Sequence, residues 1–167
     1  SKIYGLEMGA DVYVEKPFSI SYLVVQLNTL LDNRQREKDA FMRKPFLPIQ
    51  HIGMNKANEQ FLESIIDAIH ENIIDTNFNV ERLAEIACMS RSSLHRKIKA
   101  LVDLSPVDFI RFIRLKKAAE LIQSGDYRIA EVGYLVGINS SSYFIKLFSK
   151  QFGMTPKEFG KQQKGKA

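Results

Sequence analysis

The stretch Ser105–Gly125, SPVDFIRFIRLKKAAELIQSG, predicts one long helix with a defined start and end. Ser105 can cap the first free amides, and Pro106 suits the first helical position. Gly125 can adopt the left-handed conformation that ends many helices. The two segments that flank this stretch resemble each other, so we expect the helix to separate two copies of one unit.

The flanking segments form an internal repeat. After a turn in each copy, apolar, capping and proline positions recur fifty residues apart, as in Ser90 and Ser140, Pro106 and Pro156, and Phe109 and Phe159. Before the turn the separation is forty-nine, as in Ala84 and Gly133, and Cys88 and Gly137. The second turn therefore holds one extra residue. This agreement indicates two copies of one structural unit.

Each copy predicts a short helix, a tight turn and a second helix. The helices are expected at about 79–87 and 90–101 in the first copy, and at about 128–136 and 140–152 in the second. A small residue where the helices cross, Ala84 or Gly133, permits the close approach of a helix-turn-helix unit. Cys88 stands where the turn favours glycine, at an expected cost of about 1 kcal/mol.

In such a unit the start of the second helix meets base edges in the major groove of DNA. The predicted base-reading residues are Ser92, Ser93, His95 and Arg96 in the first copy, and Ser141, Ser142 and Lys146 in the second; Ile145 is also expected to face outward. Contacts to the DNA backbone are expected from Arg91, Lys99, Arg111, Arg114, Ser140 and Lys150. Arg96 can hold guanine with two hydrogen bonds. The recognition helix of the first copy is therefore expected to contribute more to base specificity, and that of the second copy more to positioning the domain on DNA.

Residues from about Asn58 to Lys161 resemble the DNA-binding domain of the AraC/XylS family of bacterial transcription regulators. Three motifs carry the resemblance: LAEIACMSRSSLHRKIKALVDLSP, the RxxRLxxAxxLI pattern of Arg111–Ile122, and VGYLVGINSSSYFIKLFSKQFGMTP. The resemblance implies an all-α fold of two helix-turn-helix subdomains joined by a long central helix, and sequence-specific binding to double-stranded DNA. The chain departs from the family pattern at Cys88, Asp103, Gly133, Ile138 and Gly160.

The start of the chain predicts a short strand at Asp11–Lys16 and an amphipathic helix at Ser19–Asn33. This segment resembles the C-terminal end of a response-regulator receiver, an α/β domain, of which it would be a strand-plus-helix remnant. The resemblance implies that Lys16 contacts a phosphorylated aspartate, that the Lys16–Pro17 bond is cis, and that Tyr13 reports the switch. Because the phospho-acceptor strand would lie upstream, we expect this chain to be part of a longer protein.

The expected organisation is a receiver remnant at 1–35, a linker at 36–57 and the tandem helix-turn-helix domain at 58–164. Together the two resemblances imply a regulator in which receiver and DNA-binding domain share one polypeptide, as in hybrid two-component systems. Such a regulator would be the output of a phosphorelay, would pair as a homodimer in its full-length form, and could contact the transcription machinery.

Composition fits this interpretation. The net charge is +5 with a pI of about 9.3. Basic residues concentrate between Arg82 and Lys117, whereas residues 59–75 contain acidic residues but no lysine or arginine. The chain has no apolar run that could span a bilayer, which favours a cytoplasmic location without membrane contact. One cysteine and three scattered histidines predict no metal site and no cofactor, and no nucleophile–base pair predicts an enzyme. The alternative is a helical module whose basic face binds an acidic protein.

Overall fold

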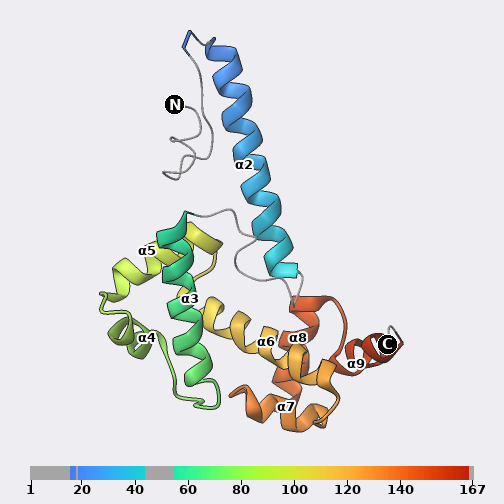
Figure 1. The fold of residues 1–167 in the computed structure, drawn as a ribbon. Helices are drawn as coiled ribbons and strands as arrows, with labels where there is room; N and C mark the ends of the chain where they lie inside the picture. The colour runs from blue at the N-terminus through green and yellow to red at the C-terminus, as the bar shows by residue number, and fades with distance from the viewer. Residues whose placement is uncertain (1–15, 18, 44–54, 166–167) are drawn as a thin grey trace.

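The computed structural model describes residues 16–17, 19–43 and 55–165. Every regular element within these ranges is a helix, which confirms the all-α fold (Figure 1). The elements are α2 (Ile20–Arg43), α3 (Lys56–Glu71), α4 (Val80–Ile86), α5 (Arg91–Val102), α6 (Pro106–Ser124), α7 (Ile129–Leu135), α8 (Ser141–Phe152) and α9 (Pro156–Lys164). The strand expected at Asp11–Lys16 and its Tyr13 lie outside the described residues, apart from Lys16.

The central helix α6 begins and ends as its sequence predicts. The Ser105 hydroxyl accepts a hydrogen bond from the Asp108 amide at 3.2 Å, and Pro106 occupies the first turn. Gly125 ends the helix with φ of 76°. Buried side chains lie all round α6, because α3 and α5 pack against it in one half of the domain and α7, α8 and α9 in the other (Figure 1).

Two hydrophobic cores divide the domain along α6. The first core combines α3, α4, α5 and the start of α6, with Leu62, Leu94 and Phe109 fully buried. The second combines the end of α6 with α7, α8 and α9, with Val132, Phe144 and Phe148 fully buried. Along α6, Ile113 belongs to the first core and Leu115 to the second. The two subdomains therefore meet at Arg114.

The internal repeat is visible in the backbone of both turns. After α4 the Met89 amide bonds to the Ala84 carbonyl at 3.0 Å, and after α7 the Ile138 amide bonds to the Gly133 carbonyl at 2.8 Å. This bond closes a helix end through one left-handed residue, which is Cys88 with φ of 53° in the first copy and Gly137 with φ of 74° in the second. The sequence prediction of both turns is confirmed, including the strained cysteine.

Helix α2 continues beyond the segment predicted for it. It runs through Arg43, past the linker boundary expected at residue 35. The charged segment that suggested a linker consists of good helix formers, and Gln35 bonds to Asp39 across one turn at 3.0 Å. The first proline in that region is Pro45, so nothing interrupts the helix earlier.

Helix α2 is capped at its start and largely exposed where its side chains are described. The Ser19 hydroxyl accepts from the Tyr22 amide at 3.1 Å, which caps α2, and the Lys16–Pro17 peptide bond is cis as the receiver resemblance implied. None of the α2 side chains that the structure describes is buried. Within the described ranges, no helix combines the length and the apolar character needed to cross a membrane.

Candidate nucleic-acid interface

Helix α5 presents a polar face from its first two turns. Ser90 caps the helix, accepting from the Ser93 amide at 3.1 Å, while Leu94 and Ile98 anchor its opposite face in the first core. The predicted base-reading residues Ser92, His95 and Arg96 are all exposed. Ser93 differs, because it is half-buried and its hydroxyl accepts from the Ser90 hydroxyl at 2.9 Å. Its first role is therefore to hold the cap.

Helix α8 repeats this arrangement in the second subdomain. Ser140 caps it, accepting from the Tyr143 amide at 3.4 Å, and Phe144 and Phe148 anchor it in the second core. The predicted base-reading residues Ser141, Ser142 and Lys146 are exposed, and so is Ile145. The two helices thus project equivalent faces from equivalent positions of the repeat.

Three of the cations predicted to contact the DNA backbone are held in ion pairs at the surface. Arg91 pairs with Glu81 at 2.9 Å, Lys99 with Asp103 at 3.1 Å, and Arg111 with Asp108 at 2.8 Å. Lys150 and Ser140 are exposed. An exposed pair is worth about 0–1 kcal/mol, so a phosphate can take the place of the carboxylate at little cost. No ion pair within the described ranges engages Arg96 or Lys146.

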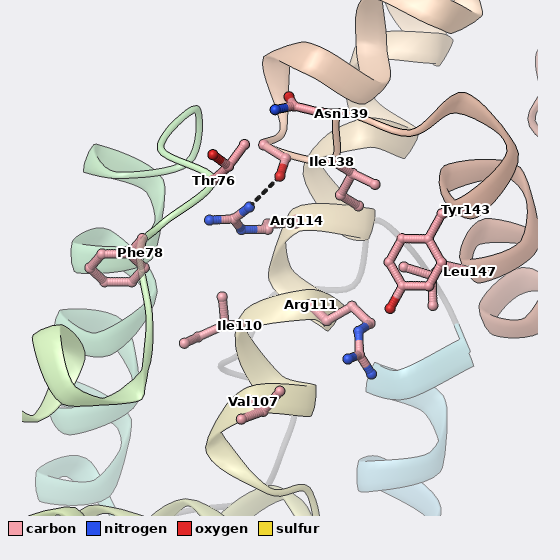
Figure 2. Close-up of a pocket in the computed structure, with 11 residues that line it drawn as sticks. Thr76, Phe78, Val107, Ile110, Arg111, Arg114, Ile138, Asn139, Tyr143 and Leu147 are labelled. Carbon is pink, nitrogen blue, oxygen red and sulfur yellow. Dashed lines mark hydrogen bonds between the residues drawn. The ribbon is translucent and has the colours of Figure 1, made fainter.

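Arg114 does not lie where the sequence placed it. We expected a DNA-backbone contact, but the side chain is only 6% exposed. Its Nη1 donates to the Gly137 carbonyl at 2.8 Å (Figure 2). Its Nη2 donates to the Asp75 carbonyl at 2.6 Å. These bonds join the loop after α3 to the turn of the second helix-turn-helix unit. Arg114 therefore fastens the two subdomains together and has no face left for phosphate.

A cleft of about 320 Å³ opens beside Arg114 between the two subdomains. Figure 2 shows its walls: Thr76 and Phe78 before α4, Val107, Ile110 and Arg111 on α6, and Tyr143 and Leu147 on α8. Val107 also lines a second hollow, with Arg91, Ser92 and His95. Since Val107 borders both hollows, the hollow beside α5 and the cleft beside α8 are neighbours on the surface of the domain.

A second basic residue is buried in α6. Lys116 is 8% exposed, its ammonium lies 5.3 Å from the Phe112 ring centroid, and burial lowers its pKa to about 8 against a smaller opposing effect of Glu120. In the unfolded chain the group keeps a pKa near 10.5. Between these values the unfolded state binds more protons, so stability rises with pH; below about pH 8 the folded state bears the full cost.

We therefore expect Lys116→Met to raise the free energy of unfolding by about 3 kcal/mol at about pH 7, since each pKa unit corresponds to about 1.4 kcal/mol. The gain should shrink as the pH rises towards 10.5. Urea unfolding across this range measures it. Lys117→Met is the control, because Lys117 is less buried and pairs with Glu120 at 2.8 Å. A gain that does not change with pH would refute the role of the Lys116 charge.

The described residues contain no group of three histidine, cysteine, aspartate or glutamate side chains able to hold a metal ion. What the site offers instead is two exposed helix faces with serines, a histidine and two cations, at matching positions of a repeat. Such faces can donate hydrogen bonds to base edges and neutralise phosphates.

Comparison with known proteins agrees with this geometry. Residues 83–162 match the family described as a helix-turn-helix domain. The chain is 43% identical, over 98% of its length, to the HTH-type transcriptional activator CfaD of Escherichia coli, of which it covers 66%. It is 34% identical, over 95% of its length, to Histidine kinase P4 of Formosa agariphila, of which it covers only 12%. The chain thus spans less than two thirds of these relatives.

A solved structure supplies a further likeness. The crystal structure of the DNA-binding domain of AdpA, a global transcriptional factor, in complex with a target DNA, matches with a TM-score of 0.56 and 25% identity. The match covers 64% of this chain and 94% of that domain.

Proposed function

Because its C-terminal part is a helix-turn-helix DNA-binding domain of the AraC family, we propose that this chain binds specific sequences in double-stranded DNA through two recognition helices, α5 and α8. The observation that carries the proposal is the pair of equivalent exposed faces, on which Arg96 and Lys146 occupy the same position of the repeat. Regulators of this family are not enzymes, and we assign the chain no catalytic role.

Each helix would enter one of two successive major grooves. Ser92, His95 and Arg96 would read the first, and Ser141, Ser142 and Lys146 the second, while Arg91, Lys99, Arg111, Ser140 and Lys150 would hold the phosphates. Arg96 supports the stronger specificity of α5, because guanidinium binds guanine through two parallel hydrogen bonds. Ser93 stays a weaker candidate, since its hydroxyl is engaged in the cap.

We also propose that this domain is the output of a two-component regulator. Two observations support the proposal: the segment before the domain resembles the end of a receiver in sequence, and almost the whole chain is similar to part of a protein named a histidine kinase. Phosphorylation of a receiver upstream would promote pairing of two chains. Pairing raises the affinity for DNA, because the second domain then binds at a high effective concentration.

Arg96→Ala tests the proposed DNA recognition. On the tightest duplex from a selection of random DNA, we expect binding to weaken by about 10–100-fold, because one bidentate base contact is worth about 1–3 kcal/mol. On random duplex the loss should be less than about threefold, since only phosphate attraction remains. Fluorescence anisotropy at fixed salt measures both affinities.

Arg82→Ala serves as the matched control for Arg96→Ala. Arg82 is an exposed arginine on α4, outside the two recognition helices, and it pairs with Glu85 at 3.0 Å. Loss of the Arg82 side chain should weaken binding to the selected duplex and to random duplex equally. If Arg96→Ala behaved in the same way, Arg96 would be a phosphate contact and not a reader of bases.

A further inference from the structure

The two recognition helices differ at one position of the repeat. His95 of α5 corresponds to Ile145 of α8, at the constant separation of fifty residues. Both side chains are exposed, and both lie one helical turn after the first residue of their helix. The first helix therefore shows the solvent a hydrogen-bonding ring where the second shows a branched apolar side chain.

Neither packing nor helix formation explains an isoleucine here. Ile145 is 40% exposed and belongs to neither core of the described chain, whereas the apolar side chains on the other side of α8 pack into the second core: Phe144, Leu147, Phe148 and Phe152. A β-branched residue is also a poorer helix former than alanine, leucine or the long polar residues that suit an exposed helix position. Single exposed apolar residues are common, but among those of the described chain Ile145 is the aliphatic one that lies on α5 or α8.

The neighbours of Ile145 define what it can meet. Ser141 and Ser142 precede it by four and three residues, and Lys146 follows it, so the apolar side chain stands within the polar face proposed to enter the groove. In the major groove the 5-methyl group of thymine is the apolar feature of a base edge. An aliphatic side chain gains most in the groove when it is buried against such a methyl group.

We propose that Ile145 is a specificity-determining residue that selects thymine in the half-site read by α8. This inference rests on the proposed function. The two half-sites would then be read by different chemistry: hydrogen bonds from His95 and Arg96 in the first, and apolar contact with one or two thymine methyl groups in the second. The serines beside Ile145 permit the close approach that this contact requires.

Deoxyuridine tests the proposal, because it lacks only the methyl group of thymine. In the tightest duplex from a selection of random DNA, each thymine is replaced singly by deoxyuridine, and anisotropy measures the affinity. For the native chain we expect at least one replacement to weaken binding about fourfold, the equivalent of one buried methyl group at about 0.8 kcal/mol. In Ile145→Ala the same replacement should change the affinity less than about 1.5-fold.

Ile86→Ala is the matched control, since Ile86 is an isoleucine on α4 with 45% exposure, close to that of Ile145. It should keep the full fourfold effect. The inference is overturned if no replacement of thymine by deoxyuridine weakens DNA binding by the native chain. It is also overturned if the replacement weakens binding by Ile145→Ala as much as binding by the native chain. A chain that selects no sequence from random DNA would overturn the proposed function itself, whereas selection without a methyl effect overturns this inference alone.

Discussion

Replacing Gly137 by alanine will lower the free energy of unfolding by about 4 kcal/mol. Gly137 is buried with φ of 74°, a conformation that costs an L-residue about 1–2 kcal/mol. A methyl group built there would lie 2.5 Å from the Ile73 carbonyl oxygen and 2.9 Å from Arg114 Cζ. Relief of this overlap must displace the backbone or the Arg114 guanidinium, which adds about 1–3 kcal/mol. Urea unfolding followed by circular dichroism measures the loss.

Gly153→Ala separates the two causes. Gly153 ends α8 with the same φ of 74°, but no atom lies within 4 Å of the position of an added methyl group. Its replacement should therefore cost only the conformational part, about 1–2 kcal/mol. If the two variants lost equal stability, the packing of Arg114 against this turn would contribute nothing. If Gly137→Ala were as stable as the native chain, the left-handed conformation of this turn would also be contradicted.

Much of the fold could be predicted because its signals are local. The caps Ser90, Ser105 and Ser140 and the stops at Gly125 and Gly137 act within one helical turn, so neighbouring residues suffice to identify them. The internal repeat predicted the second unit, because its cap, turn and apolar positions match those of the first and therefore indicate the same structure. The positions that we predict to read bases followed from the same register, and all of them except Ser93 are exposed.

Arg114 could not be placed in this way. Like Arg111, it was expected to contact the DNA backbone, since a cation is usually exposed. The structure buries it because α6 is surrounded by helices from both subdomains, and its partners are backbone carbonyls far along the chain. Backbone carbonyls leave no mark in the sequence. The signal that was available is the distribution of apolar residues around the whole circumference of α6, which indicates a helix without a solvent face.

The extension of α2 was missed for a different reason. Charged residues between Arg34 and Asp39 are compatible with both a linker and an exposed helix, and composition alone favoured the linker. Intrinsic propensity would have decided correctly, since the segment lacks glycine and proline until Pro45. The boundary between linker and DNA-binding domain stays a prediction.

The second large effect that we expect concerns the spacing of the two recognition helices. Helix α6 has 19 residues and is therefore about 28 Å long, somewhat shorter than the 34 Å of one DNA turn. Both cores and the Arg114 bonds fasten the subdomains to it. If both units bind DNA as proposed, two units held in this way would read half-sites at one separation only. They differ from units on a flexible linker, which would tolerate many separations.

The most direct test of this account changes the distance between the half-sites of a selected duplex. Inserting half a turn, about five base pairs, should weaken binding about 100-fold or more, because the contacts of one recognition helix are lost. Inserting a full turn, about ten base pairs, should weaken binding as much. The second half-site then faces the same side of the duplex again, but it lies too far from the first. Affinity retained with either insertion would contradict two recognition helices fixed by α6 in successive major grooves.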